Sequence, residues 1–279
     1  MSVEAALTPH PAVFDGIAAV RARRSVRLAP AVFIVGVLTF LFAPGTVVVL
    51  FSFNASPRLA FPFESITLDW YAAAFSNARV VRAFTASLIA ALVTGIVASL
   101  MGTAFAMGMI KLRAGVRGLA LSVALLPAVV PPLLLGISLT VFFNGIGQRL
   151  GLATAIAGHV LVALPFVVLT MNARLELFDL TVLEAARDLG ASSWRAFRDV
   201  TLPLIRPAVI GGALLAMAVS LDEFVVTFFT IGSDQTMPVL IWGMMRRGID
   251  PTVNAIATVI ITATVILAAL ANRASRLRL

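Results

Sequence analysis

Two adjacent carboxylates stand inside an apolar run, where an ionised group is costly. Asp222 and Glu223 are the only charged residues between positions 207 and 233. At membrane depth such a group is expected to face a water-filled cavity or a partner. Phe224 and Phe228 follow closely, and aromatic faces attract cations. The pattern indicates the lining of a path for a cation, built from these four side chains.

A structural ion pair is the alternative interpretation of the same carboxylates. Arg246 and Arg247 in the following loop could supply the positive charge. Adjacent positions on a helix point about 100° apart, so Asp222 and Glu223 are not expected to share one role.

A histidine in another apolar run raises the question of catalysis. His159 with Ser138 is the only candidate Ser–His pair for an intramembrane serine protease. Leu139 follows that serine where a glycine is expected, which argues against the protease. A packing or hydrogen-bonded role for His159 is favoured over contact with a proton or a substrate.

The sequence lacks the residues that thiolate, metal and ATP-hydrolysing sites require. The chain has no cysteine and two histidines, which disfavours thiolate, cysteine–metal and multi-histidine sites. A P-loop needs Gly-Lys followed by Ser or Thr. The only lysine, Lys111, lies in Met-Ile-Lys-Leu. We therefore expect no catalytic residue, no metal and no cofactor in this chain.

The elements that position these residues are membrane helices. Charged residues make up 12% of the chain, about half the share of a soluble domain. Long charge-poor runs are sufficient to cross a bilayer. They predict an all-α membrane protein with six transmembrane helices, at residues 28–53, 83–110, 118–143, 152–171, 208–231 and 252–271. Prolines at 127, 131 and 132 are expected to bend or break the third helix. The loop 232–251 could include a re-entrant or interfacial segment.

The distribution of positive charge predicts the orientation. Of the 21 Lys and Arg residues, 15 fall in segments on one side and six on the other. The six are Arg58, Arg79, Arg82, Arg149, Arg246 and Arg247. The positive-inside rule then makes both termini cytoplasmic, as a tail at 1–27 and a tail at 273–279. The basic balance reflects topology and anionic lipid, and nucleic acid is not expected as a partner.

A charged island within the loop 174–206 is too polar to cross lipid. Residues 184–189 and 192–199 have helical character, and Gly190 permits a sharp turn between them. Ser192 or Ser193 can cap the second helix. The island is either a coupling helix that docks on a partner subunit or an amphipathic helix on lipid headgroups.

The island closely resembles the EAA loop of ABC importer permeases. Glu184-Ala185-Ala186, then Gly190, Val200 and Leu202-Pro203 stand at the spacing of that loop. The resemblance implies a type I ABC importer permease (MetI-like) fold. It also implies that ATPase coupling is carried by Glu184, Ala185, Ala186, Gly190, Ala191, Trp194 and Phe197.

A second stretch narrows the resemblance. Residues 220–226, with Gly232 and Met237-Pro238, are similar to permeases of spermidine/putrescine importers. Many of those have two aspartates where this chain has Asp222-Glu223. The implied substrate is a polyamine or related small organic cation. The alternatives are an amino-acid derivative, a quaternary amine or an organophosphonate delivered by a receptor, or a secondary transporter.

The resemblance also implies an assembly in the bacterial inner membrane. We expect two ATP-binding subunits, which bind ATP and Mg²⁺, a second related permease subunit and a periplasmic solute-binding protein. Membrane lipids surround the spans.

Overall fold

The described part of the molecule is helical. The computed structural model describes residues 25–56, 62–177, 181–247 and 250–276. Outside its helices, these residues form one isolated β-bridge, between Asn54 and Ile66. The chain divides into two units, residues 1–48 and residues 49–279.

The first long helix agrees with its predicted position. Helix α2, Ser25–Phe51, covers most of the predicted span 28–53. The predicted tail 1–27 lies outside the described residues, apart from the start of this helix at Ser25.

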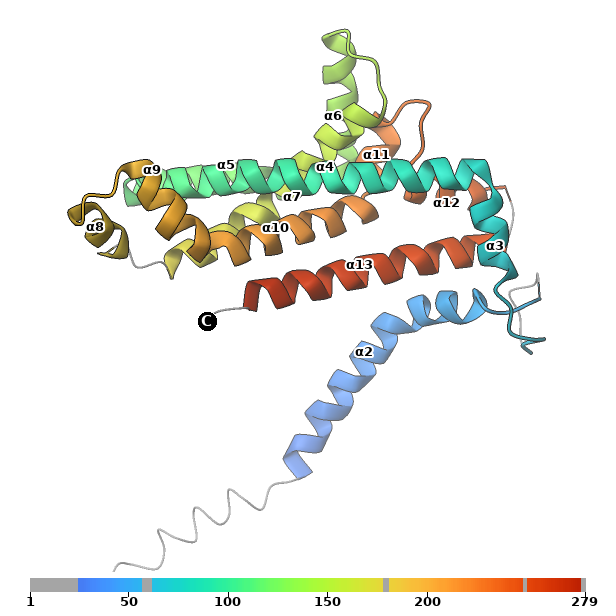
Figure 1. The fold of residues 1–279 in the computed structure, drawn as a ribbon. Coiled ribbons are helices and arrows are strands. Elements are labelled where there is room, and N and C mark those ends of the chain that lie inside the picture. Colours follow the sequence, from blue (N-terminus) through green and yellow to red (C-terminus); the bar gives the residue numbers. More distant parts are fainter. Residues whose placement is uncertain (1–24, 57–61, 178–180, 248–249, 277–279) are drawn as a thin grey trace, which may run out of the picture. The chain divides into compact units, whose positions relative to one another are not determined.

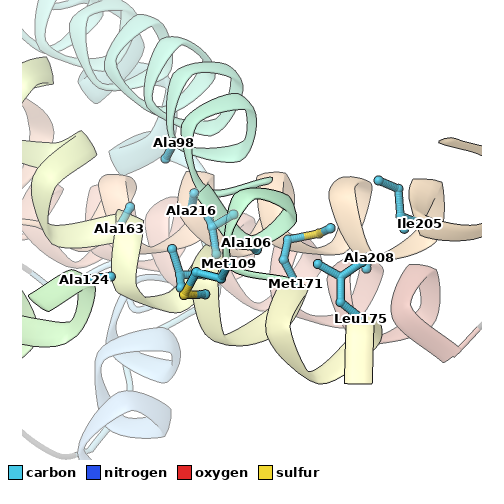
Figure 2. Packing of buried hydrophobic residues seen from close by; sticks show 12 residues of the cluster. Ala98, Ala106, Met109, Ala124, Ala163, Met171, Leu175, Ile205, Ala208 and Ala216 are labelled. Atoms are coloured by element: carbon cyan, nitrogen blue, oxygen red, sulfur yellow. The ribbon is translucent and has the colours of Figure 1, made fainter. Parts of the chain in front are cut away.

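Three long helices pack together at the centre of the second unit. They are α4 (Ala78–Met109), α7 (Leu152–Glu176) and α10 (Leu202–Asp222), and α13 (Thr252–Arg276) packs against α10 (Figure 1). α13 extends beyond the predicted helix 252–271 and into the predicted tail. Small residues fill much of the contact, including Ala98, Ala106, Ala163, Ala208 and Ala216 (Figure 2). Such residues allow the close backbone approach on which membrane helices rely.

Gly102 of α4 shows how close this approach is. A Cβ built at Gly102 would lie 2.6 Å from Cγ1 of Val167 on α7. Val167 itself is fully buried. Any larger residue at position 102 would therefore push α4 and α7 apart.

The third predicted span is two helices. α5 (Ala114–Val129) and α6 (Pro132–Gly145) meet at an angle of 96°. Pro127 remains inside α5, whereas Val130 and Pro131 are extended, with ψ of 128° and 130°. Neither Pro131 nor Pro132 has an N–H to donate, and each disfavours a helical residue before it. The predicted break is confirmed, and the predicted span 118–143 is a bent pair of helices.

The fifth predicted span has different limits from those expected. The continuous helical span begins at Ser193 and ends at Asp222. Glu223 is extended, with φ −70° and ψ 104°, and a separate short helix, α11 (Val225–Thr230), follows. A single helix over 208–231 is therefore wrong at both ends.

Short helices complete the two ends of the bundle. α3 (Asp69–Ser76) and α12 (Met237–Met245) pack with α4 and α13 around Val80, Leu240 and Ile256. α12 is the helix found within the loop where a re-entrant or interfacial segment was predicted. α8 (Thr181–Asp188) and α9 (Ser193–Ala196) lie at the opposite end, where α13 finishes (Figure 1).

The count of membrane spans agrees with the prediction when the bent pair is included. Among the described residues, five helical segments are long and apolar enough to cross a membrane, and α5 with α6 makes six.

Candidate functional site

The predicted coupling loop is a helix–turn–helix with a glycine at the turn. Gly190 has φ of +85°, a conformation that L side chains rarely adopt. Its N–H donates to the carbonyl of Arg187 at 2.8 Å, and the N–H of Ala191 donates to the carbonyl of Ala186 at 3.0 Å. These two bonds form a Schellman motif, which satisfies the last carbonyls of α8. The predicted turn is confirmed.

The second helix of the loop begins where a cap was predicted. The Ser192 hydroxyl accepts from the N–H of Arg195 at 3.3 Å, so Ser192 is the cap. Trp194 is 67% exposed, and its ring centroid lies 5.6 Å from that of Phe197. A large exposed aromatic beside the turn is suited to contact with another surface.

The second helix of the coupling loop is continuous with the membrane helix that follows it. After α9 the chain forms a π-helical turn, η1 (Phe197–Thr201), and continues directly into α10. Pro203 stands two residues after the end of η1 and has no N–H to donate to the preceding turn, and the helix is π-helical rather than α-helical at that turn. Residues 193–199 are therefore the first turns of the helical span that ends at Asp222.

A cavity of about 410 Å³ separates the coupling loop from the bundle. Glu184, Phe197 and Thr201 line it on the side of the loop. Ile110, Lys111 and Leu175, from the ends of α4 and α7, line the other side.

The remaining predicted coupling residues lie away from this cavity. Ala185, Gly190 and Trp194 are exposed, and Ala186 and Ala191 are half-buried. Two large apolar side chains stand exposed beside the turn, Leu189 at 89% and Trp194 at 67%.

The two carboxylates occupy different environments at the break after α10. Asp222, the last residue of α10, is exposed. Glu223 is half-buried, and its Oε1 accepts from the N–H of Val226 at 2.9 Å. The Glu223 carboxylate therefore satisfies a free donor in the first turn of α11. The two carboxylates therefore differ in exposure and contacts, and the expectation that they do not share one role stays a prediction.

The alternative interpretation, an ion pair with Arg246 or Arg247, finds no support among the described residues. Within the described ranges, the ion pairs are Arg117–Glu176 at 3.4 Å and Arg198–Asp199 at 2.8 Å. Arg246 instead stacks on Trp242, with its Cζ 4.8 Å from the ring centroid.

Asp222 lines a pocket together with aromatic side chains. Asp222, Phe224 and Trp242 line a cavity of about 300 Å³, which is otherwise apolar. The ring centroid of Phe228 lies 5.7 Å from Phe224 and 5.1 Å from Trp242, which places it against the same aromatic wall. A carboxylate beside aromatic faces is a suitable environment for an ammonium group.

Trp242 is a site residue that sequence reasoning missed. It belongs to α12, in the loop after α11, and its ring lies 5.9 Å from that of Phe224. No spacing rule connects it to Asp222, because only the packing of α12 brings the two into one pocket.

His159 makes buried contacts with the residues on both sides of the break between α10 and α11. Its Nδ1 lies 2.6 Å from the Ser220 hydroxyl and its Nε2 lies 2.5 Å from the Thr227 hydroxyl. The Ser220 hydroxyl also lies 3.4 Å from that of Thr94 on α4, and Thr227 donates to the carbonyl of Glu223 at 2.6 Å. All four side chains are buried. The network connects α4, α7, α10 and α11 around the start of α11.

These contacts decide between the roles considered for His159. Both ring nitrogens are engaged by Ser220 and Thr227, while Ser138 is exposed on α6. The hydrogen-bonded role is confirmed, and the Ser138–His159 pair is wrong.

The network predicts a stability effect of replacing the histidine. His159→Ala should destabilise the protein by about 1–3 kcal/mol, because it removes one hydrogen bond from each of two buried hydroxyls, those of Ser220 and Thr227. Ser138→Ala, at an exposed position, should leave stability unchanged. The measurement is the thermal unfolding midpoint of the purified chain in lipid nanodiscs. Equal midpoints for the two variants would contradict the structural role of the network.

Comparison with known proteins extends these observations. Residues 95–278 match the family described as binding-protein-dependent transport system inner membrane component. The spermidine/putrescine transport system permease protein PotC of Escherichia coli K12 is 32% identical over 236 residues, covering 84% of this chain and 89% of that protein. The putrescine transport system permease protein PotI of the same strain is 32% identical over 234 residues, covering 81% and 83%.

Solved structures agree in fold. A chain of a bacterial ABC transporter for import of the acidic polysaccharide alginate aligns with a TM-score of 0.68 and 17% identity, over 91% of this chain and 96% of that chain. A chain of the MetNI methionine ABC transporter, in an inward-facing conformation, aligns with a TM-score of 0.60 and 18% identity, over 70% and 94%.

Proposed function

We propose that this chain, which belongs to the family of binding-protein-dependent transport system inner membrane components, forms half of the translocation path for a polyamine or related small organic cation. The observation that carries the substrate class is the pocket at the end of α10. There a carboxylate, Asp222, stands beside the rings of Phe224 and Trp242. Similarity to permeases named for spermidine and putrescine supports the same class.

Transport is coupled to ATP through the loop around Gly190. Two ATP-binding subunits carry ATP and Mg²⁺ and dock on α8 and α9, with Glu184, Ala185 and Ala186 shaping the first helix. Trp194 presents the exposed apolar side chain of the second helix, and the half-buried ring of Phe197 packs beside it. This chain supplies no P-loop lysine, so hydrolysis occurs on those partner subunits.

Two further proteins complete the importer. A second related permease subunit forms the other half of the path, and a periplasmic solute-binding protein delivers the cation. Closure of the ATP-binding subunits moves the coupling loop, and the path opens alternately to each side of the membrane.

The coupling loop lies on the cytoplasmic side of the bacterial inner membrane, together with both termini. The charge asymmetry of the loops supports this orientation. Figure 1 shows α8, α9 and the last described turn of α13 at one end of the bundle, with α12 at the other.

Cysteine labelling tests the orientation. The chain has no native cysteine, so single cysteines can be introduced without background. Ser193→Cys should react only with membrane-permeant maleimides in intact cells, whereas Ser76→Cys should react with impermeant ones. Both positions are exposed. The reverse pattern would contradict the orientation and the coupling assignment with it.

Reconstitution tests the function itself. Proteoliposomes containing the complete importer should accumulate labelled spermidine only when both loaded receptor and ATP are present. A complex that instead accumulates an amino-acid derivative, a quaternary amine or an organophosphonate would remain an importer but would refute the polyamine assignment. Uptake without ATP would refute the coupling.

A further inference from the structure

The cavity of about 410 Å³ between the coupling loop and the bundle has an amphipathic lining. Five of the side chains that line it are apolar: Met107, Ile110, Leu175, Leu183 and Phe197. Leu175 is buried, and the other four are half-buried. They come from the ends of α4 and α7, from α8 and from η1. Apolar surface of this kind is stabilised by contact with an apolar group, which indicates a ligand that carries one.

Two cations line the same cavity from different elements. Lys111 follows the end of α4, and Arg187 lies in the last turn of α8. Among the described residues, neither side chain belongs to an ion pair. Glu184 is the one acidic residue among the described residues of the lining, so the ionisable groups there carry a net positive charge. The cavity therefore favours an anion, and a polycationic substrate is disfavoured in it.

Hydroxyl groups complete the polar part of the lining. Ser193 and Thr201 both line the cavity. A hydroxyl can donate to a phosphate oxygen. Arginine binds phosphate through a planar fork of donors, and lysine binds it as a point charge. A guanidinium, an ammonium and two hydroxyls are therefore a suitable set of donors for a phosphate group.

The cavity lies where the membrane spans end. Ile110 and Leu175 stand at the ends of α4 and α7, both of which are long and apolar enough to cross a membrane, and Thr201 directly precedes α10. α8 and α9 lie at this end of the bundle (Figure 1). In the proposed orientation this end is cytoplasmic. The cytoplasmic leaflet carries anionic lipids, and basic pockets between membrane helices bind their headgroups.

We propose that this cavity binds an anionic phospholipid of the cytoplasmic leaflet, with the phosphate between Lys111 and Arg187 and the start of an acyl chain against the apolar lining. The bound lipid connects the end of α4 to α8 and so links the coupling loop to the bundle. Because the phosphate engages both cations, the Glu184 carboxylate remains available to the ATP-binding subunits. This last step rests on the proposed function, whereas the binding of lipid can be measured without transport.

Retention of lipid by the complete complex tests the site directly. The complex in detergent is titrated with mixtures of phosphatidylglycerol and phosphatidylcholine and washed, and the bound lipid is quantified by mass spectrometry. The wild type should retain phosphatidylglycerol in preference to phosphatidylcholine. Lys111→Gln and Arg187→Gln should each weaken the binding of phosphatidylglycerol about fivefold, because one basic side chain near anionic lipid contributes about that factor.

Arg113→Gln and Arg195→Gln are the matched controls. Arg113 follows Lys111 in the same loop, and Arg195 lies on the coupling loop beyond Gly190. Both side chains are exposed, and neither lines the cavity. Each control therefore removes one cation from the same segments of the chain, and both should retain phosphatidylglycerol like the wild type.

Vesicle composition tests the consequence for coupling. In proteoliposomes of phosphatidylcholine, added phosphatidylglycerol should increase receptor-stimulated ATP hydrolysis by the wild type. This increase should be absent from the double variant Lys111→Gln, Arg187→Gln. Inorganic phosphate added to vesicles of pure phosphatidylcholine should not replace the lipid, because it has no apolar group to contact the lining.

Equal binding of phosphatidylglycerol by the wild type and both single variants would overturn the site. So would a wild type without preference for phosphatidylglycerol, or controls that lose as much lipid as Lys111→Gln. Restoration by inorganic phosphate would reveal a site for a free anion and refute the lipid, and equal ATP hydrolysis in both kinds of vesicle would refute the effect on coupling.

The binding measurement also separates this site from the proposed function. If the double variant fails to assemble, the single variants and the lipid preference of the wild type still decide the question. A complex that retains phosphatidylglycerol as expected but transports no polyamine would refute the proposed function and leave the lipid site intact.

Discussion

Gly190→Val is expected to reduce receptor-stimulated ATP hydrolysis by about tenfold. With φ at +85°, Gly190 adopts a left-handed conformation that costs an L residue about 1–2 kcal/mol, and a β-branched residue is tolerated least. No heavy atom lies within 4 Å of a Cβ built at this position. The substitution therefore acts on the backbone turn alone and changes the angle between α8 and α9. The measurement is ATPase activity of the complete complex in proteoliposomes, with and without loaded receptor.

Gly118→Val is the matched control for this experiment. Gly118 is an exposed glycine of α5, and a Cβ there also meets no atom within 4 Å. Its φ is not positive, so the added side chain should leave the stimulation near its wild-type value. Wild-type stimulation in Gly190→Val itself would contradict the coupling role of the turn.

Asp222→Asn is expected to lower polyamine uptake about 10- to 100-fold at low substrate concentration. Asparagine keeps the size and hydrogen-bonding capacity of the side chain but removes the charge that faces the aromatic pocket. A hydrogen bond to a charged group contributes about 1.5–3 kcal/mol, which corresponds to this loss. The measurement is uptake of labelled spermidine, beside a pull-down that confirms assembly. Binding of polyamine to the isolated receptor should not change.

Glu223→Gln is the control that shows whether the loss of uptake is specific to the charge of Asp222. The carboxylate of Glu223 accepts from the N–H of Val226, and a carboxamide oxygen can still do so. We therefore expect less than a threefold change in uptake, a small fraction of the effect of a lost charge-assisted contact. If both variants assemble and transport like wild type, the carboxylates are structural. If Asp222→Asn prevents assembly, its role lies in folding.

The membrane spans could be predicted because their signal is local. A helix in lipid satisfies its own backbone hydrogen bonds, so an uninterrupted apolar run of sufficient length is enough to identify it. The turn at Gly190 and the cap at Ser192 were predictable for the same reason. Each depends on one residue type at one position, and both are present in the structure.

The ends of the fifth helix were not predictable from local signals. Residues 223–231 are as apolar as those before them, apart from Glu223 itself. His159 contacts Ser220 before the break and Thr227 after it, across 61 and 68 residues of sequence, and such contacts leave no local signal. Trp242 was not predicted as a site residue for the same reason, because only the packing of α12 brings it beside Asp222 and Phe224. The coupling and path roles of the predicted residues remain predictions.

The π-helical turn between the coupling loop and α10 changes the rotation of α10 about its own axis relative to α9. α9, η1 and α10 form one helix of 30 residues, Ser193–Asp222, about 45 Å long at 1.5 Å per residue. In η1 the N–H of Leu202 bonds to the carbonyl of Phe197, which encloses one residue more than an α-helical turn. One residue corresponds to about 100° of rotation about the helix axis. The extra residue in η1 therefore changes the side of the helix on which Asp222 lies, although Asp222 stands at the opposite end of that helix.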